Sequence, residues 1–122
     1  MDWRTWVFNR IQSLAGGRVF STLDGAPDER PFIVIRLAQD VPEIHSSEGG
    51  QSTNCLIWVY DEPGSYLGID TLLKQVRTAI IGPVAQSNGI DAIWLGDSQD
   101  LADDEWGVIT RNGTYRLVGR MG

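Results

Sequence analysis

Apolar residues near the start of the chain recur every three or four positions, the spacing of one face of an α-helix. Between residues 2 and 14 the apolar side chains on this face are Trp3, Trp6, Val7, Ile11 and Leu14. Asp2 is a candidate N-terminal cap, and Gly16-Gly17 is typical of a helix end. Because this helix would bury two tryptophans, we expect it to dock on a large flat surface such as a sheet.

Two later segments have the composition of β-strands. Side chains of residues 32–38 point alternately to two faces, and each face carries apolar residues. Residues 54–60 are rich in β-branched and aromatic side chains. The polar stretch between them, residues 39–53, has fifteen residues, which is long for a hairpin connection. Connections of that length are usually functional or disordered. We therefore predict a long loop or hairpin arm between the first two main strands.

The second half repeats the alternation of helix and strand. Helical spacing over residues 67–81 follows Ser65 and ends at Gly82-Pro83, and residues 90–95 predict a third strand. The final segment, residues 106–122, is strand-like in one of two ways. Either Asn112-Gly113 forms a two-residue hairpin turn, or a single strand runs from about residue 114 to 119 after an irregular segment.

This order of elements predicts an α+β fold. Few connections are long enough to join parallel strands, so we expect a small, mainly antiparallel β-sheet flanked by two α-helices. The 122 residues contain no internal repeat, low-complexity tract or linker. We therefore assign residues 1–122 to a single domain.

Composition and charge exclude several classes of protein. Ten Lys and Arg against sixteen Asp and Glu leave a net charge of −6, which argues against avid nucleic-acid binding. One cysteine excludes a disulfide framework and a cysteine-cluster zinc site. No apolar run approaches the ~20 residues of a membrane span. The first residues lack the pattern of a signal peptide, so we expect synthesis in the cytoplasm.

The residues that carry enzyme chemistry are scarce. The single histidine, His45, lies in the polar stretch, and Cys55 lies inside a strand, where a small buried side chain is expected. No nucleophile elbow, phosphate-binding glycine loop or dinucleotide fingerprint is present. Five carboxylates between residues 97 and 105 lack the spacing of a calcium loop. We therefore expect no enzyme activity, no cofactor and no bound metal.

Charge along the second half suggests contacts between copies of the chain. The acidic segment, which includes Asp103 and Asp104, is followed by Arg111, Arg116 and Arg120. These arginines either lie on solvated strand faces or contact the acidic segment of a neighbouring copy. If the arginines contact the acidic segment of a neighbouring copy, the interface is head-to-tail, and such an interface closes into a ring when its rotation permits.

The five tryptophans are a surplus for a chain of this length. We expect Trp3 and Trp6 in the helix core, and Trp58 and Trp94 in the strand core. Trp106 either caps the core of its own domain or anchors an interface with another protein.

The sequence resembles the tail terminator (tail completion) proteins of long-tailed bacteriophages, especially those of actinobacterial phages and, more distantly, the lambda-like terminators. The resemblance covers nearly the full length and rests on the order of the segments, with no catalytic motif. Besides the N-terminal helix and the polar stretch, the segments that carry it are residues 30–35, 55–61, 69–73, 94–98 and 114–118.

The resemblance implies a non-enzymatic ring in the virion, usually a homohexamer. Such a ring caps the head-proximal end of the tail tube, ends tube polymerisation and provides a surface for head-tail joining. Its partners would be its own copies, the tail tube protein and the connector or neck proteins, with genomic DNA passing through the lumen unbound and no membrane involved. Residues 39–53, including Glu43, His45 and Glu48, would clasp the adjacent tube ring. Two alternatives stay open: another connector component, such as a head-completion or neck protein, and a small cytosolic ligand-binding domain.

Overall fold

Both predicted helices are present in the computed structural model, which describes residues 3–21, 27–42, 51–82 and 90–119. Helix α1 spans Trp3–Ile11 and α2 spans Tyr66–Ile81. The buried residues of α1 are the predicted Trp3, Trp6, Val7 and Ile11. Leu14 belongs instead to a short 3-10 turn, η1 (Leu14–Gly17), in which Ala15 and both glycines have positive φ. This left-handed backbone ends the helical segment.

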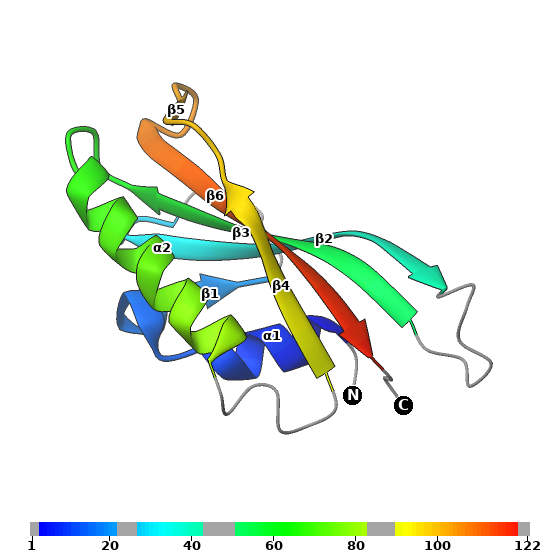
Figure 1. The fold of residues 1–122 in the computed structure, drawn as a ribbon. Coiled ribbons are helices and arrows are strands. Elements are labelled where there is room, and N and C mark those ends of the chain that lie inside the picture. The colour runs from blue at the N-terminus through cyan, green and yellow to red at the C-terminus, as the bar shows by residue number, and fades with distance from the viewer. Residues whose placement is uncertain (1–2, 22–26, 43–50, 83–89, 120–122) are drawn as a thin grey trace.

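In the part of the chain that the structure describes, six strands form one sheet (Figure 1). The strands are β1 (Val19–Phe20), β2 (Phe32–Pro42), β3 (Gln51–Asp61), β4 (Ile90–Asp97), β5 (Leu101–Asp103) and β6 (Val108–Gly119). Their order is β1-β2-β3-β6-β4, and β5 also pairs with β6. Every pairing is antiparallel except that of β1 with β2. The predicted α+β class and mainly antiparallel sheet are confirmed.

The polar stretch between β2 and β3 contains more strand than predicted. The two strands stay paired as far as Pro42 and Gln51, across a register shift between Leu37 and Asp40. The predicted loop bounds, residues 39 and 53, are therefore both wrong, because paired strand extends inside them. Of the two predicted forms, the described part matches the hairpin arm. Strand pairing needs backbone groups alone, so polar residues at the end of a hairpin can extend it without an apolar pattern. Residues 43–50 lie outside the described residues, and with them Glu43, His45 and Glu48.

Strand β6 is continuous from Val108 to Gly119. The predicted hairpin turn is therefore wrong, whereas the single strand over residues 114–119 is present and starts earlier than predicted. Asn112 and Gly113 are in the middle of the strand, opposite Trp58 and Ile57 of β3. The positions on both sides of β6 are occupied by other strands, which hold this Asn-Gly pair extended. A side chain at Gly113 would meet the Asp97 carboxylate and the Tyr115 ring, with its Cβ 3.0 and 3.2 Å from their nearest atoms.

The two faces of the sheet bury different clusters. The face under α1 and α2 carries the main core, to which β2 contributes Ile33 and Ile35. On the opposite, helix-free face, a smaller cluster consists of Phe32, Val34, Tyr60 and Val108, with Phe20, Trp58 and Trp106 packed against it. The alternation of side chains along β2 assigns its residues to the two clusters.

Candidate assembly interface

The described part of the chain offers no chemical centre of the usual kinds. It contains no group of three or more His, Cys, Asp or Glu residues placed to hold a metal ion. Cys55 is 1% exposed, as expected of a small core residue, and burial raises the pKa of its thiol to about 12. None of the described helices is long and apolar enough to cross a membrane. The candidate sites are therefore surfaces.

The acidic segment is partly engaged within its own chain. The Asp97 carboxylate accepts hydrogen bonds from Arg77 (2.9 Å) and from the Trp94 indole (3.0 Å). Asp103 accepts one from the backbone N–H of Trp106 (3.0 Å), which closes the turn after β5. Asp104 and Glu105 are exposed. The segment therefore presents only part of its charge to a partner.

Two of the three predicted arginines, Arg111 and Arg116, lie on opposite faces of β6. Arg111 is on the helix side of β6, where it forms an ion pair with Asp70 of α2 and lies 3.6 Å from Asp100. Its guanidinium also donates to the Ser98 carbonyl (2.9 Å). Arg116 is an odd number of residues away along the strand, which places it on the helix-free face. Arg120 lies outside the described residues.

Trp106 packs against its own chain. Its ring lies 5.6 Å from that of Tyr60 and 6.1 Å from that of Phe32, measured between centroids. Arg30 holds the backbone below it by donating to the carbonyls of Trp106 (2.9 Å) and Gly107 (3.3 Å). Of the two interpretations of Trp106, the structure supports that of a cap on the domain's own core.

Trp94 is not in the strand core, and that prediction was wrong. It is 39% exposed, and its neighbours Ile93 and Leu95 are 49% and 54% exposed. The reason is the position of β4 at the end of the sheet, with β6 as its only described neighbour. We call Ile93, Trp94 and Leu95 the edge patch. Sequence reasoning missed this surface because three large apolar residues in a row look the same in a central strand and in an edge strand.

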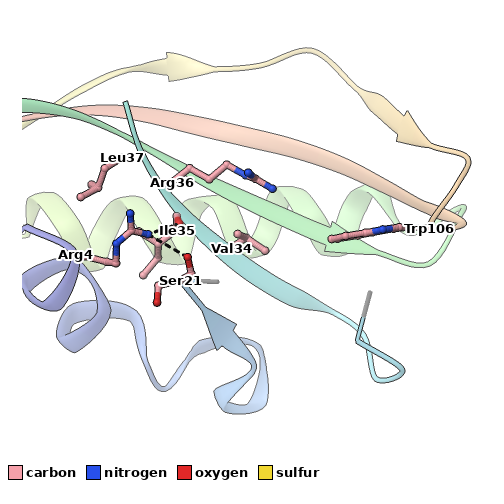
Figure 2. Close-up of a pocket in the computed structure, with 7 residues that line it drawn as sticks. All are labelled: Arg4, Ser21, Val34, Ile35, Arg36, Leu37 and Trp106. Atoms are coloured by element: carbon pink, nitrogen blue, oxygen red, sulfur yellow. Dashed lines mark hydrogen bonds between the residues drawn. The ribbon is translucent and has the colours of Figure 1, made fainter. Parts of the chain in front are cut away.

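A groove lies at the other end of the sheet, along the outer side of β2 (Figure 2). Its volume is about 370 Å³. It is lined by Arg4, Ser21, Val34, Ile35, Arg36, Leu37 and Trp106. Arg4 of α1 donates to the carbonyls of Ser21 (3.1 Å) and Ile35 (3.3 Å). The packing of α1 against β2 brings Arg4 to the same edge as Arg36, so spacing along the chain gave no signal for them.

A chain of similar fold occurs in a solved virus-like particle. It belongs to the structure titled "Virion of native gene transfer agent (GTA) particle", and the two chains superpose with a TM-score of 0.77. The match covers 96% of this chain and 93% of the other at 12% sequence identity, so it shows a shared fold. No protein-family model matches the sequence, and the search of curated proteins gave no match.

Proposed function

We propose that the protein is a structural component of a phage-like virion. The observation that carries this proposal is the match of the whole fold to a chain of a gene transfer agent virion. The apolar edge patch supports it, because large exposed apolar groups on a small protein mark contacts with other proteins.

Within the virion, we assign the protein to the head-proximal end of the tail tube. There a ring of about six copies ends tube polymerisation and provides the surface for head-tail joining. The resemblance of the sequence to tail terminators supports this finer role. The tail tube protein and the connector or neck proteins are the other partners of the ring.

The charge of the chain suits a ring through which DNA passes. The net charge of −6 repels phosphate, and a conduit must not retain the genome that it transmits. Replacing exposed carboxylates on the lumen side by lysine is therefore expected to slow DNA ejection. Unchanged ejection would contradict this role of the charge.

Electron microscopy of particles produced without this chain tests the assignment. A terminator predicts tails that grow beyond their normal length, with normal length restored when the wild-type chain is supplied from a plasmid. A head-completion or neck protein, the second candidate, predicts tails of normal length that are not attached to heads. Intact, infectious particles would refute both roles.

A further inference from the structure

The sheet ends in two strand edges that differ from each other. At one end β4 pairs with β6 on its inner side, and no described strand pairs with its outer side. At the other end β1 covers β2 at Ile33 and Val34, and the Arg4 side chain donates to the Ile35 carbonyl. The part of this edge without a described backbone or side-chain partner begins beyond Ile35, and β2 continues to Pro42. Both edges are visible in Figure 1, on either side of the paired β3 and β6. Unpaired edges of this kind accept additional strands.

The β4 edge lacks most of the features that protect edge strands from association. It contains no lysine, arginine or proline, and only the bulge near Leu95 interrupts its regular pairing. Its exposed apolar side chains lie on both faces: Ile93 is on the helix-free face, and Trp94 is on the helix side, where it contacts Arg77 of α2. Ile90 and Ala92 are buried on the helix side, so Asp91 and Ile93 are on the helix-free face, and both are exposed.

The β2 edge has the complementary charge and shape. Arg36 is exposed and lies on the helix-free face beside Val34, and Arg4 lies at the groove along the same edge. The groove adds an apolar lining that includes Leu37 and Trp106 (Figure 2). An acidic and apolar strand therefore has a basic and apolar counterpart at the opposite end of the same molecule.

We propose that β4 of one copy adds to the outer edge of β2 in a second copy, so that the sheet continues from subunit to subunit. Asp91 then lies near the Arg36 side chain of the next copy, and Ile93, on the same face of β4, packs along its groove. Because the two edges are unlike, the contact is heterologous, and successive copies form a ring if the rotation closes. The inference deepens the proposed function, since it identifies the contact on which the proposed ring rests.

A symmetric pairing of β4 with β4 is the obvious alternative for a second copy. Neither β4 strand supplies a basic partner for Asp91 in that pairing, because β4 contains no lysine or arginine. That arrangement also leaves the basic groove unused, so charge favours the head-to-tail contact.

Thiol cross-linking of purified protein tests the proposal, with Ile93→Cys and Arg36→Cys as reporters. The short bis-maleimide used as the probe spans on the order of 10 Å, about the distance between two neighbouring strands with an offset of a few residues. A mixture of the two single variants is expected to yield a cross-linked dimer, and the double variant a ladder of oligomers. Each single variant alone, and the wild type with its buried Cys55, should stay uncross-linked. A dimer from Ile93→Cys alone, or no product in the mixture, would overturn the proposal.

Charge reversal provides a second, independent measurement. Arg36→Glu is expected to raise the dissociation constant for self-association at least tenfold, and adding Asp91→Arg should restore it. Lys74→Glu, at an exposed position of α2, is the matched control and should leave assembly unchanged. Equal association by Arg36→Glu and the wild type would count against the contact.

The proposed function and this contact fail in distinguishable ways. Rings of wild-type mass that give no cross-link between the two edges refute the contact and leave a terminator role standing. Cross-linked ladders from a protein whose deletion leaves tail length unchanged support the contact and refute the terminator role.

Discussion

At the scale of single residues, three side chains connect the edge strand to helix α2. The Arg77 guanidinium lies 3.7 Å from the centre of the Trp94 ring and pairs with Asp97 at 2.9 Å. The Trp94 indole donates to the other oxygen of the same carboxylate. This closed set of contacts holds a large aromatic group in place at the surface, which favours its use in a contact.

Replacing Asp97 by alanine tests this arrangement. The change removes the acceptor of one charged and one neutral hydrogen bond, so we expect the free energy of unfolding to fall by about 1.5–3 kcal/mol. Asp100→Ala is the control, since its side chain is 62% exposed and its ion pair is long; its effect should stay within about 0.5 kcal/mol. Urea denaturation measures both, and equal losses would contradict the prediction.

Alkaline pH should destabilise the fold through its buried acids. Burial raises the pKa of the Cys55 thiol from 9.0 to about 12, and burial followed by the nearby Asp97 charge raises that of Tyr115. The folded state therefore retains protons that the unfolded state releases, so the stabilisation is full below pH 9 and is lost as the pH rises. For Cys55 the loss is about 1.4 kcal/mol per pH unit between pH 9 and 12.

The Cys55→Ala variant isolates this contribution. Between pH 9 and 12 its free energy of unfolding should fall less steeply with pH than that of the wild type, by the amount that one proton contributes. Denaturation at a series of pH values measures both slopes. Identical slopes for the variant and the wild type would show that the thiol ionises equally in both states.

At the scale of elements, α1 is held by two tryptophans that are both buried against the sheet. The predicted stripe and the observed buried face agree because helical spacing is a local property. By contrast, the exposure of Trp94 depends on which strand lies beside β4, and the sequence has no local signal for that neighbour. The same limit applies to Asn112-Gly113, a turn signal that the pairing on both sides of β6 overrides.

Substitutions of Trp6 measure how α1 is attached. Trp6→Ala removes a side chain that is 3% exposed, so we expect a loss of about 3–5 kcal/mol. Trp6→Phe should cost less than Trp6→Ala, because it keeps an aromatic ring in the core and the indole N–H that it removes has no acceptor in the described part of the chain. Asn9→Ala, at an exposed position of the same helix, should change little. Chemical denaturation distinguishes the three, and equal costs for Trp6→Phe and Trp6→Ala would contradict the packing argument.

At the scale of the whole molecule, the helices cover one face of the sheet, and the strands leave two unlike edges. The arm formed by β2 and β3 projects beyond the helix-covered body in Figure 1. A domain of this shape can contact neighbours through its edges and its arm at the same time. In the proposed terminator ring, the edges would contact neighbouring copies and the arm would contact the tube.

Shortening the arm tests its role as a clasp on the tube ring. Deletion of residues 46–50, which lie outside the described residues, is expected to leave the fold intact, because the pairing of β2 with β3 starts at Pro42 and Gln51. If the clasp anchors the ring, particles that carry the deletion will have tails of irregular, greater length by electron microscopy. Circular dichroism of the purified variant is the control for folding. Tails of normal length would reject the clasp.

The sequence by itself determined the helices, the main strands and the α+β class, because periods of 3.6 and 2 residues are expressed by neighbours along the chain. It also determined that Cys55 is a core residue. The tertiary structure alone decided that Trp94 is exposed, that Arg111 pairs with Asp70, and that Arg4 and Arg36 share one edge. These outcomes depend on the order of strands in the sheet and on the packing of the helices against it, which bring distant segments together through contacts that no local pattern records.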